Sequence, residues 1–513
     1  MFTEELKLEL TLTAGSATTQ VGCGDIERFQ LSLHAWGFEA EVTFSTWPER
    51  GADGAFAALS ALAPVTARLQ ISSARPPTPA PDPLIAEGLV IETSALEGTL
   101  ESVTGRPLRR RELTIRFADA AQVLWRQHFP CELVADSGLG KVIERQLVQG
   151  ITLEQKWSIL ATEHPLVCLG LGADPSGASF YDFLLWYTEA HGGAFSFDAQ
   201  ESAYSLAATK PKLGTPAALA ALDVAGSRSV SPPRARHDLR LLDAQAAAPS
   251  TVLVTNDESV AGVRRDVLLR PPTALAFETA EATETARLLG DGPAAYLELE
   301  LARYPGVNLS PGARVKTATT SGWSAKSWAA NRSLRVFDLA LSGRANASPG
   351  DESGLAARLF VVEGLAQLEE ETDSAQRLPA YVTPTLECVA EARVVAAGGE
   401  EEDRRWQVSE DDRAGGQVYT LDVLLWNAKI VVPFQPDQQT GHLFFPAYKQ
   451  STVLVELGLH SARLARHLDW GPGVQLPQDG QGDHILLGFS ETTETSIAHQ
   501  YVDGAPELVV RRF

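Results

Sequence analysis

The sequence predicts a mainly β protein with some helix, of the α+β class. Leucine and phenylalanine alternate with polar residues in many short segments, beginning with ELKLELTLT near the N-terminus. A two-residue period of this kind is typical of a half-buried strand. The best-defined helical pattern is short, and it leads directly into two further alternating segments. We therefore expect sheets to form most of the fold, with few helices.

The length and composition are those of a multidomain globular protein. At 513 residues the chain has room for about three domains of roughly 150 residues each. No window approaches the ~18 consecutive apolar residues of a membrane span, and the N-terminus carries acids where a signal peptide would carry bases. We expect a protein with no membrane anchor, which is made and kept in the cytoplasm unless a machine exports it.

The net charge disfavours a nucleic-acid-binding protein, and the cysteine spacing disfavours a disulfide or metal framework. The net charge of −22 disfavours nucleic-acid binding, and the only dense basic run, 109–111, lies beside a predicted strand at 113–117. The four cysteines have no CxxC spacing and no histidine cluster beside them, which predicts reduced, buried thiols. They are Cys23, Cys131, Cys168 and Cys388.

The first strands follow from alternation. One strand is expected within the first dozen residues, and two more on either side of Gly37. Residues 74–84 hold five prolines and predict a loop. Strand patterns resume at 89–98 and 111–120, followed by a short helix after residue 120 and a helix and strand within 138–157.

The best-defined helix is expected at residues 179–191. Ser179 can cap its first turn, and Asp182 completes a capping box. Tyr181, Thr188 and Glu189 are expected to point away from the core. The apolar residues recur at three- and four-residue spacing and so share one face. They are Phe180, Phe183, Leu184, Tyr187 and Ala190.

A turn and a hairpin follow this helix. The pair Gly192 and Gly193 ends it, with one glycine expected in the left-handed conformation. Phe195 and Phe197 then alternate with small residues, and a second alternating strand ends at Leu206. These two phenylalanines, together with Phe180, Phe183 and Tyr187 of the helix, are predicted to lie in a barrel core or in a ring contact between copies.

Later segments predict more strands and two helices. Strand signals occur at 251–270 and 333–343, and helices are expected near 279–289 and at 352–372. Short strands separated by polar turns then fill 384–489, as a small five-stranded barrel requires. The last two dozen residues alternate again near their end.

No catalytic or metal-binding motif is present. The sequence lacks GxSxG, HExxH, P-loop and strand-following GxGxxG motifs. His460 and His467 are the only neighbouring histidines, and their spacing does not imply a metal. The acidic runs at 400–403 and 410–412 lack the pattern of a calcium loop. We expect no enzyme activity, no metal and no cofactor.

A carbohydrate-binding or carbohydrate-active β protein is the alternative reading. The separation of carboxylates in space, which glycoside hydrolysis requires, is invisible in sequence. Four tryptophans could form a sugar-stacking platform, although core and interface anchors are the favoured interpretation. They are Trp323, Trp328, Trp426 and Trp470.

The helix, double glycine and aromatic hairpin of residues 179–206 resemble the hub segment of the valine-glycine-repeat spike family (VgrG) of type VI secretion and contractile phage tails. The order of strands in 384–489 is similar to the OB domain of that family. The resemblance implies two tube-like β-barrels plus an OB-fold β-barrel. The first barrel would span 1–150, completed by about 235–275, and the second would span 151–380 with helical insertions.

Two departures accompany the resemblance. The family's basic GRV strand and Pro-Arg-Ile-Gly element are replaced by FFPAYKQSTVLV. The family's long β-helix needle is reduced to 490–513, a short spike start or docking strand, or a separate protein supplies it. Arg511, Arg512 and Phe513 are the candidate residues for docking a needle or tip protein.

The resemblance implies a structural protein of a contractile injection system. It would be a homotrimeric baseplate hub that joins the six-fold tail tube to the three-fold spike and delivers effectors by puncture. Its partners would be the tail tube protein, a spike needle or tip protein, baseplate proteins and effector cargo. It would be cytoplasmic when assembled and exported on contraction. The sequence does not distinguish a type VI system from an injection particle or a phage.

Overall fold

The computed structural model describes the chain except for 51–52, 102–106, 234–235, 245–249, 270–294, 347–354, 396–407, 412–415, 434–446, 448, 470–483, 491–492 and 513. The chain divides into two compact units. The first unit comprises Met1–His128, Leu147–Trp157 and Tyr181–Tyr381, and the second comprises Phe129–Gln146, Ser158–Phe180 and Val382–Phe513. The mainly β prediction is confirmed.

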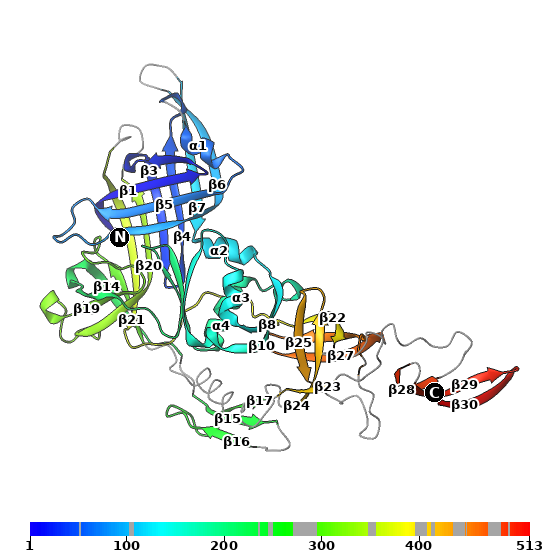
Figure 1. The fold of residues 1–513 in the computed structure, drawn as a ribbon. Coiled ribbons are helices and arrows are strands. Elements are labelled where there is room, and N and C mark those ends of the chain that lie inside the picture. The colour runs from blue at the N-terminus through cyan, green and yellow to red at the C-terminus, as the bar shows by residue number, and fades with distance from the viewer. Residues whose placement is uncertain are drawn as a thin grey trace. The chain divides into compact units, whose positions relative to one another are not determined.

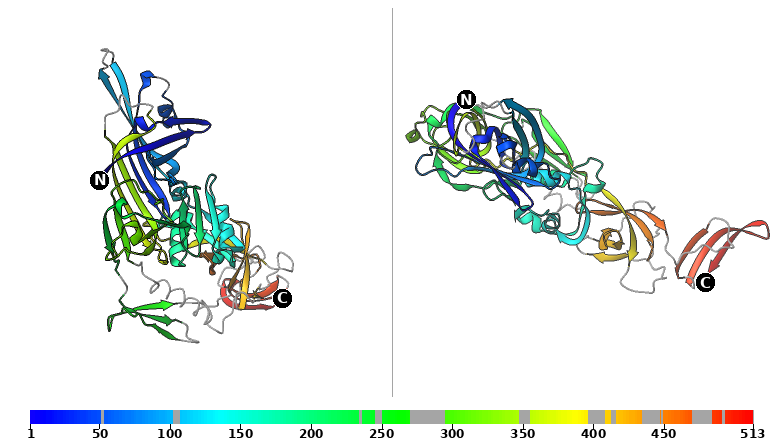
Figure 2. Two further views of the ribbon diagram at one scale, coloured as in Figure 1. Left: turned by 90° about the vertical axis from the view of Figure 1, so that its left-hand side faces the viewer. Right: turned by 90° about the horizontal axis from the view of Figure 1, so that it is seen from above.

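A closed ring of antiparallel strands forms much of the first unit (Figures 1 and 2). Each strand pairs with the next, and the last pairs with the first. In order they are β20 (Arg332–Ala345), β3 (Ile26–His34), β4 (Gly37–Thr46), β7 (Pro107–Ala118), β6 (Leu84–Glu101), β5 (Val65–Ser73), β1 (Phe2–Ala14) and β21 (Arg358–Glu370). β2 (Ala17–Val21) pairs antiparallel with residues 10–14 of β1.

Alternation along the ring strands explains their burial. Leu6, Leu8, Leu10 and Leu12 of β1 are at most 1 % exposed, while the residues between them are more exposed. The same alternation runs along β5, whose Ala67, Leu69 and Ile71 are fully buried. The sequence pattern therefore identified strand positions and faces correctly, because apolar side chains on one face of each strand fill the ring.

Two long strands continue from the ring into a second set of strands. On β20, residues 338–344 pair with β3, whereas residues 332–335 pair with β19 (Ala313–Thr317). On β21, residues 358–362 pair with β1, whereas residues 365–368 pair with β18 (Tyr296–Leu301). β13 (Leu213–Ala218) and β14 (Val224–Val230) form the two ends of this 13-stranded sheet.

This pairing corrects the expected return of the chain. The strands β20 and β21 complete the ring, not 235–275. β16 (Thr251–Val254) and β17 (Arg264–Leu269) instead flank β15 (Asp238–Asp243) in a separate three-stranded sheet. Alternation identifies a strand but carries no information about its partner, which explains the error.

The helix expected at 352–372 is wrong, since β21 occupies most of this segment. Phe360, Val362, Ala366 and Leu368 are fully buried in the sheet. Leu, Ala, Gln and Glu favour helix locally, but tertiary pairing on both sides of the strand overrides that preference. The helix expected near 279–289 lies outside the described residues.

The helix, turn and hairpin of 179–206 are confirmed. α4 (Phe180–Ala190) is followed by β11 (Ala194–Asp198) and β12 (Ala203–Ala207), and β12 pairs in parallel with β9 (Thr152–Lys156). Gly192 has a φ of 67°, the left-handed conformation. A Cβ on Gly193 would overlap the ring of Trp157. Both glycines are therefore required by the local structure.

α4 is buried more completely than its pattern suggested. Tyr181 and Thr188 were expected to point outward, but both are 0 % exposed. The Thr188 hydroxyl donates to the Leu184 carbonyl at 2.7 Å, which satisfies its polar group inside the helix. Of the three residues expected outside, only Glu189 is exposed.

Besides α4, the described residues form three shorter α-helices. α1 (Gly54–Leu59) and α2 (Ala120–Leu124) begin after capping aspartates, Asp53 and Asp119. α3 (Leu139–Arg145) and β9 confirm the helix and strand expected within 138–157. Within the described ranges, no helix is long and apolar enough to cross a membrane.

The second unit contains a six-stranded antiparallel sheet. β8 (Cys131–Gly138) and β10 (Glu163–Gly170) pair with each other and share the core of this sheet through Leu133, Leu166 and Cys168. The strands of the larger sheet are β22 (Cys388–Val395), β23 (Val408–Asp411), β24 (Gly416–Val423), β25 (Ala428–Pro433), β26 (Thr452–Leu457) and β27 (Ala462–Asp469).

The last strands form a sheet of their own. β28 (His484–Ser490) pairs with β29 (Thr493–Val502), which pairs with β30 (Ala505–Arg512). The strand at the end of 384–489 was expected to belong to the small barrel, and this pairing corrects that expectation. Neighbours in sequence form this hairpin sheet because each connection is short.

Candidate functional site

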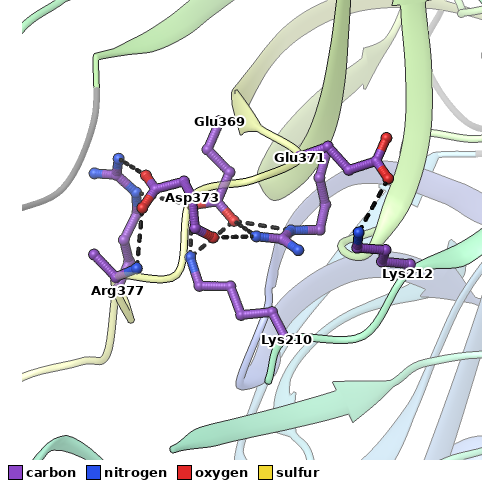
Figure 3. Close-up of polar contacts among 8 residues, drawn as sticks. Lys210, Lys212, Glu369, Glu371, Asp373 and Arg377 are labelled. Carbon is purple, nitrogen blue, oxygen red and sulfur yellow. Dashed lines mark hydrogen bonds and ion pairs between the residues drawn. The ribbon is translucent and has the colours of Figure 1, made fainter. Parts of the chain in front are cut away.

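A buried charge network lies where β20 and β21 leave the ring (Figure 3). Arg335 and Glu369 are direct cross-strand partners, and Nη2 of Arg335 lies 2.6 Å from Oε1 of Glu369. Lys210 Nζ lies 2.8 Å from the other carboxylate oxygen of Glu369. The side chains of Arg335 and Glu369 are 4 % and 1 % exposed. The paired guanidinium and carboxylate therefore satisfy each other away from water.

Further groups enclose this pair. Arg335 also donates to the carbonyl of Asp373 at 2.7 Å, and Arg377 lies 3.6 Å from the carboxylate of the same residue. The Arg377 guanidinium also stacks over the rings of Tyr296 and Phe337 at 4.6 and 4.5 Å. The network thus ties the segment after β21 to both strands.

A more exposed carboxylate lies next to the network. Glu371 accepts from Arg314 at 2.6 Å and pairs with Lys212 at 3.4 Å. The hydrogen bond from Arg314 lowers the pKa of Glu371, whereas burial lowers the pKa of Lys210. Cations outnumber carboxylates in these ion pairs, although the chain as a whole is strongly acidic.

A cavity of about 800 Å³ adjoins this network within the first unit. Cationic, acidic and aromatic side chains all line its wall, among them Lys210, Arg335, Glu369 and Phe195. No histidine or cysteine is among the described residues that line the cavity. Nor do the described residues include a group of three or more His, Cys, Asp or Glu placed to hold a metal ion. The arrangement is suited to holding the paired side chains in fixed positions.

The aromatic residues predicted as core or ring contact are buried within the chain. Phe180 and Phe183 are 0 % exposed, Tyr187 is 3 %, Phe195 is 1 % and Phe197 is 6 %. In the first unit, Phe197 packs against Phe38 and Tyr204 at centroid distances of 5.9 and 4.8 Å. Its backbone N–H donates to the Ala35 carbonyl at 2.8 Å. This packing links the hairpin to the end of the ring.

Asp119 forms a second buried polar centre, which sequence reasoning missed. Its carboxylate accepts from the Tyr204 hydroxyl at 2.6 Å, from the Gln122 amide at 2.6 Å and from the Phe38 N–H at 3.0 Å. Burial raises its pKa, and these hydrogen bonds oppose the rise. The signal in the sequence is the capping box Asp119–Gln122 before the short helix. Only the fold brings Tyr204 to it.

The candidate docking residues lie on the terminal sheet. Arg511 and Arg512 are exposed on β30, an edge strand, and Phe513 lies outside the described residues. Leu508 and Val510 on the same strand are 72 % and 65 % exposed. An exposed edge with apolar side chains is suited to pairing with another chain.

The structure buries three of the four cysteines. Cys23, Cys168 and Cys388 are buried as expected, but Cys131 is exposed, and none of the four forms a disulfide bond.

The described tryptophans differ in exposure. Trp323 donates to the Leu219 carbonyl at 2.8 Å and is 7 % exposed. Trp426 belongs to the other unit and donates to the Cys131 carbonyl at 2.9 Å. Trp328 is 37 % exposed, and Trp470 lies outside the described residues.

Comparison with known proteins identifies a fold. No family model and no curated protein matches the sequence. A chain of the Francisella PdpA–VgrG complex in a lidded form is similar, with a TM-score of 0.70 at 11 % identity, over 99 % of this chain and 80 % of that one. In the lidless complex the TM-score is 0.67 at 11 % identity, over 100 % of this chain and 99 % of the matched chain. This chain has that fold.

A third similar structure is the E. coli c3393 protein, described as a component of the type VI secretion system that resembles T4 bacteriophage tail proteins. Its TM-score is 0.48 at 11 % identity, over 89 % of this chain and 99 % of that one. The fold assignment rests on the PdpA–VgrG complex, whose TM-scores are higher.

Proposed function

We propose that this protein is the structural hub of a contractile injection apparatus, which joins a six-fold tail tube to a three-fold spike. The observation that carries the proposal is the correspondence of fold along the whole chain with a chain of the PdpA–VgrG complex. The shared strands β20 and β21 add a physical reason, since they build two sets of strands into one continuous sheet. Such a unit transmits force without a hinge between its parts.

One edge of the 13-stranded sheet is open to pairing with another copy, as a homotrimer requires. β14 is an edge strand with mostly exposed side chains, whereas the opposite edge, β13, carries Pro216, which cannot donate to a neighbouring strand. An edge without such protection favours pairing with another chain, and cyclic symmetry closes such contacts. Three copies with two tube-like parts each would match a six-fold tube ring.

The terminal sheet supplies the proposed spike contact. The exposed Leu508 and Val510 would be covered by a needle or tip protein, with Arg511 and Arg512 flanking that apolar strip. Tail tube and baseplate proteins would contact the first unit, which contains the ring, and effector cargo would travel with the spike. In this proposal the protein is cytoplasmic when assembled and leaves the cell on contraction.

The mass of the purified protein in solution tests the hub directly. Light scattering should give about three times the 55.1 kDa of one chain, since cyclic closure requires three copies. A monomer that persists at high concentration, with candidate tube and needle proteins added, would refute the proposal. If that monomer were also stabilised by glycans, the carbohydrate-binding alternative would replace it.

A further inference from the structure

Three of the four cysteines meet in the second unit, although they are far apart in the sequence. Cys131 begins β8, Cys168 lies near the end of β10 and Cys388 begins β22. The sulfur atoms of Cys168 and Cys388 are 3.5 Å apart. Cys131 lies near enough to Cys388 for each of these two thiols to shift the pKa of the other. Cys388 is therefore the central member of the cluster.

The backbone around the cluster is shaped to admit Cys388. Gly170, two residues after Cys168, pairs in register with Cys131. A Cβ on Gly170 would lie 3.4 Å from the Cβ of Cys388 and 3.2 Å from the carbonyl oxygen of Leu386. The absence of a side chain at Gly170 thus leaves room for the start of β22 to lie over this part of β10.

The three thiols differ in exposure and in acidity. Cys168 is 0 % exposed and Cys388 is 5 % exposed, whereas Cys131 reaches the surface. Hydrogen bonding from Cys168, followed by that from Cys131, lowers the pKa of Cys388 to about 7. The pKa values of Cys168 and Cys131 are raised. Cys388 is therefore the thiol of the cluster that ionises most readily, and a thiolate is the reactive form of cysteine.

We propose that this cluster is an oxidation site, at which hydrogen peroxide converts Cys168 and Cys388 to a disulfide bond between β10 and β22. The Cys388 thiolate attacks one peroxide oxygen, so that an S–O bond forms, the O–O bond breaks and hydroxide leaves as water after taking up a proton. Cys388 is then a sulfenic acid.

The second step forms the disulfide bond. The sulfur of Cys168 attacks the sulfur of Cys388, the S–O bond breaks, and the leaving hydroxide takes the proton of Cys168 to form water. Two thiols are oxidised by two electrons, and one peroxide is reduced to two waters. The 3.5 Å between the sulfurs must shorten to the ~2.05 Å of a disulfide, a movement within reach of side-chain rotation. Cys131 stays reduced.

The disulfide would join the two-stranded and six-stranded sheets of the second unit covalently. Its two cysteines are 220 residues apart in the sequence, so the bond would restrict a long loop in the unfolded chain. We expect oxidation to raise the melting temperature of this unit by about 4 °C or more. A chain that passes from a reducing to an oxidising environment would be locked in its folded form.

Mass spectrometry of the full-length protein tests the proposal. The reduced protein is treated with hydrogen peroxide, blocked with N-ethylmaleimide in denaturant and digested without reductant. The expected result is a cross-linked peptide that joins Cys168 and Cys388, with Cys131 and Cys23 alkylated. Full alkylation of all four cysteines after peroxide would overturn the proposal, as would a Cys131–Cys388 crosslink or sulfinic acid on Cys131 alone.

Two variants give readouts that a structural role alone would not produce. Cys168→Ser keeps a hydroxyl that can donate to Cys388 but cannot form a disulfide, so it should stop the reaction at the Cys388 sulfenic acid, which dimedone traps. Cys23→Ser serves as a matched control that forms the disulfide normally. The rate of wild-type oxidation should rise with pH, because the Cys388 thiolate is the attacking form and its pKa is lowered. A rate that does not rise with pH, or no dimedone adduct in folded Cys168→Ser, would contradict the assigned order of steps.

Discussion

Replacement of Glu369 by glutamine tests whether the buried charge network holds the two long strands together. The substitution keeps the shape of the side chain but removes the negative charge shared by Arg335 and Lys210. These cations are 4 % and 11 % exposed, so water cannot replace the lost partner. Removal of one member of a buried ion pair costs about 3–5 kcal/mol.

The effect of pH follows from Lys210. Burial already lowers its pKa, and Glu369 opposes that shift, so Glu369→Gln should lower the pKa further. A lysine whose pKa is lower in the folded state binds fewer protons there than in the unfolded state. Stability therefore rises with pH across the interval between the two pKa values. The deficit of the variant should be largest at neutral pH and should shrink as the medium becomes alkaline.

Hydrogen exchange of peptides from β21 is the appropriate assay, because it reports local opening and does not require the whole chain to unfold in one step. Glu369→Gln should lower the opening free energy of this strand by about 3–5 kcal/mol. Glu371→Gln is the matched control, since its partners Arg314 and Lys212 are 24 % and 55 % exposed and water can replace the lost carboxylate, so about 1 kcal/mol or less is expected. Equal, small effects of the two substitutions would refute the reasoning.

Three further predictions concern other parts of the chain. Tyr204→Phe removes a donor from buried Asp119 and should destabilise the first unit by about 2–4 kcal/mol in urea unfolding. Since the pKa of Asp119 is raised in the fold and rises further in the variant, the deficit should grow as pH increases through that pKa, and a deficit independent of pH would contradict this. Gly193→Ala should cost about 1–3 kcal/mol because its Cβ would overlap Trp157, and an unchanged melting temperature would argue against that packing. Reversing the charges of Arg511–Arg512 to glutamate should weaken binding of a candidate needle protein without changing the melting temperature, and unaltered binding would exclude this pair from the contact.

The sequence by itself determined the local elements that short-range physics controls. Alternation predicted the first strand with its buried leucines, and the same pattern predicted the strand at 333–343. Apolar spacing followed by two glycines predicted α4, its turn and its hairpin, because a helix must end where the chain adopts a left-handed conformation. The segment 179–206 also carried the family resemblance, and the comparison with solved structures supports the fold that this resemblance implies.

Only the tertiary structure decided how distant segments meet. It made a strand of 358–370 despite its helix-forming residues, and it assigned the completion of the ring to β20 and β21. It also brought Tyr204 to Asp119, placed Glu369 opposite Arg335 and gathered three cysteines around Cys388. Periodicity reports which face of an element is buried, but each of these contacts depends on long-range strand pairing. A strand's pattern is compatible with many partners, and the packing of the whole unit selects among them.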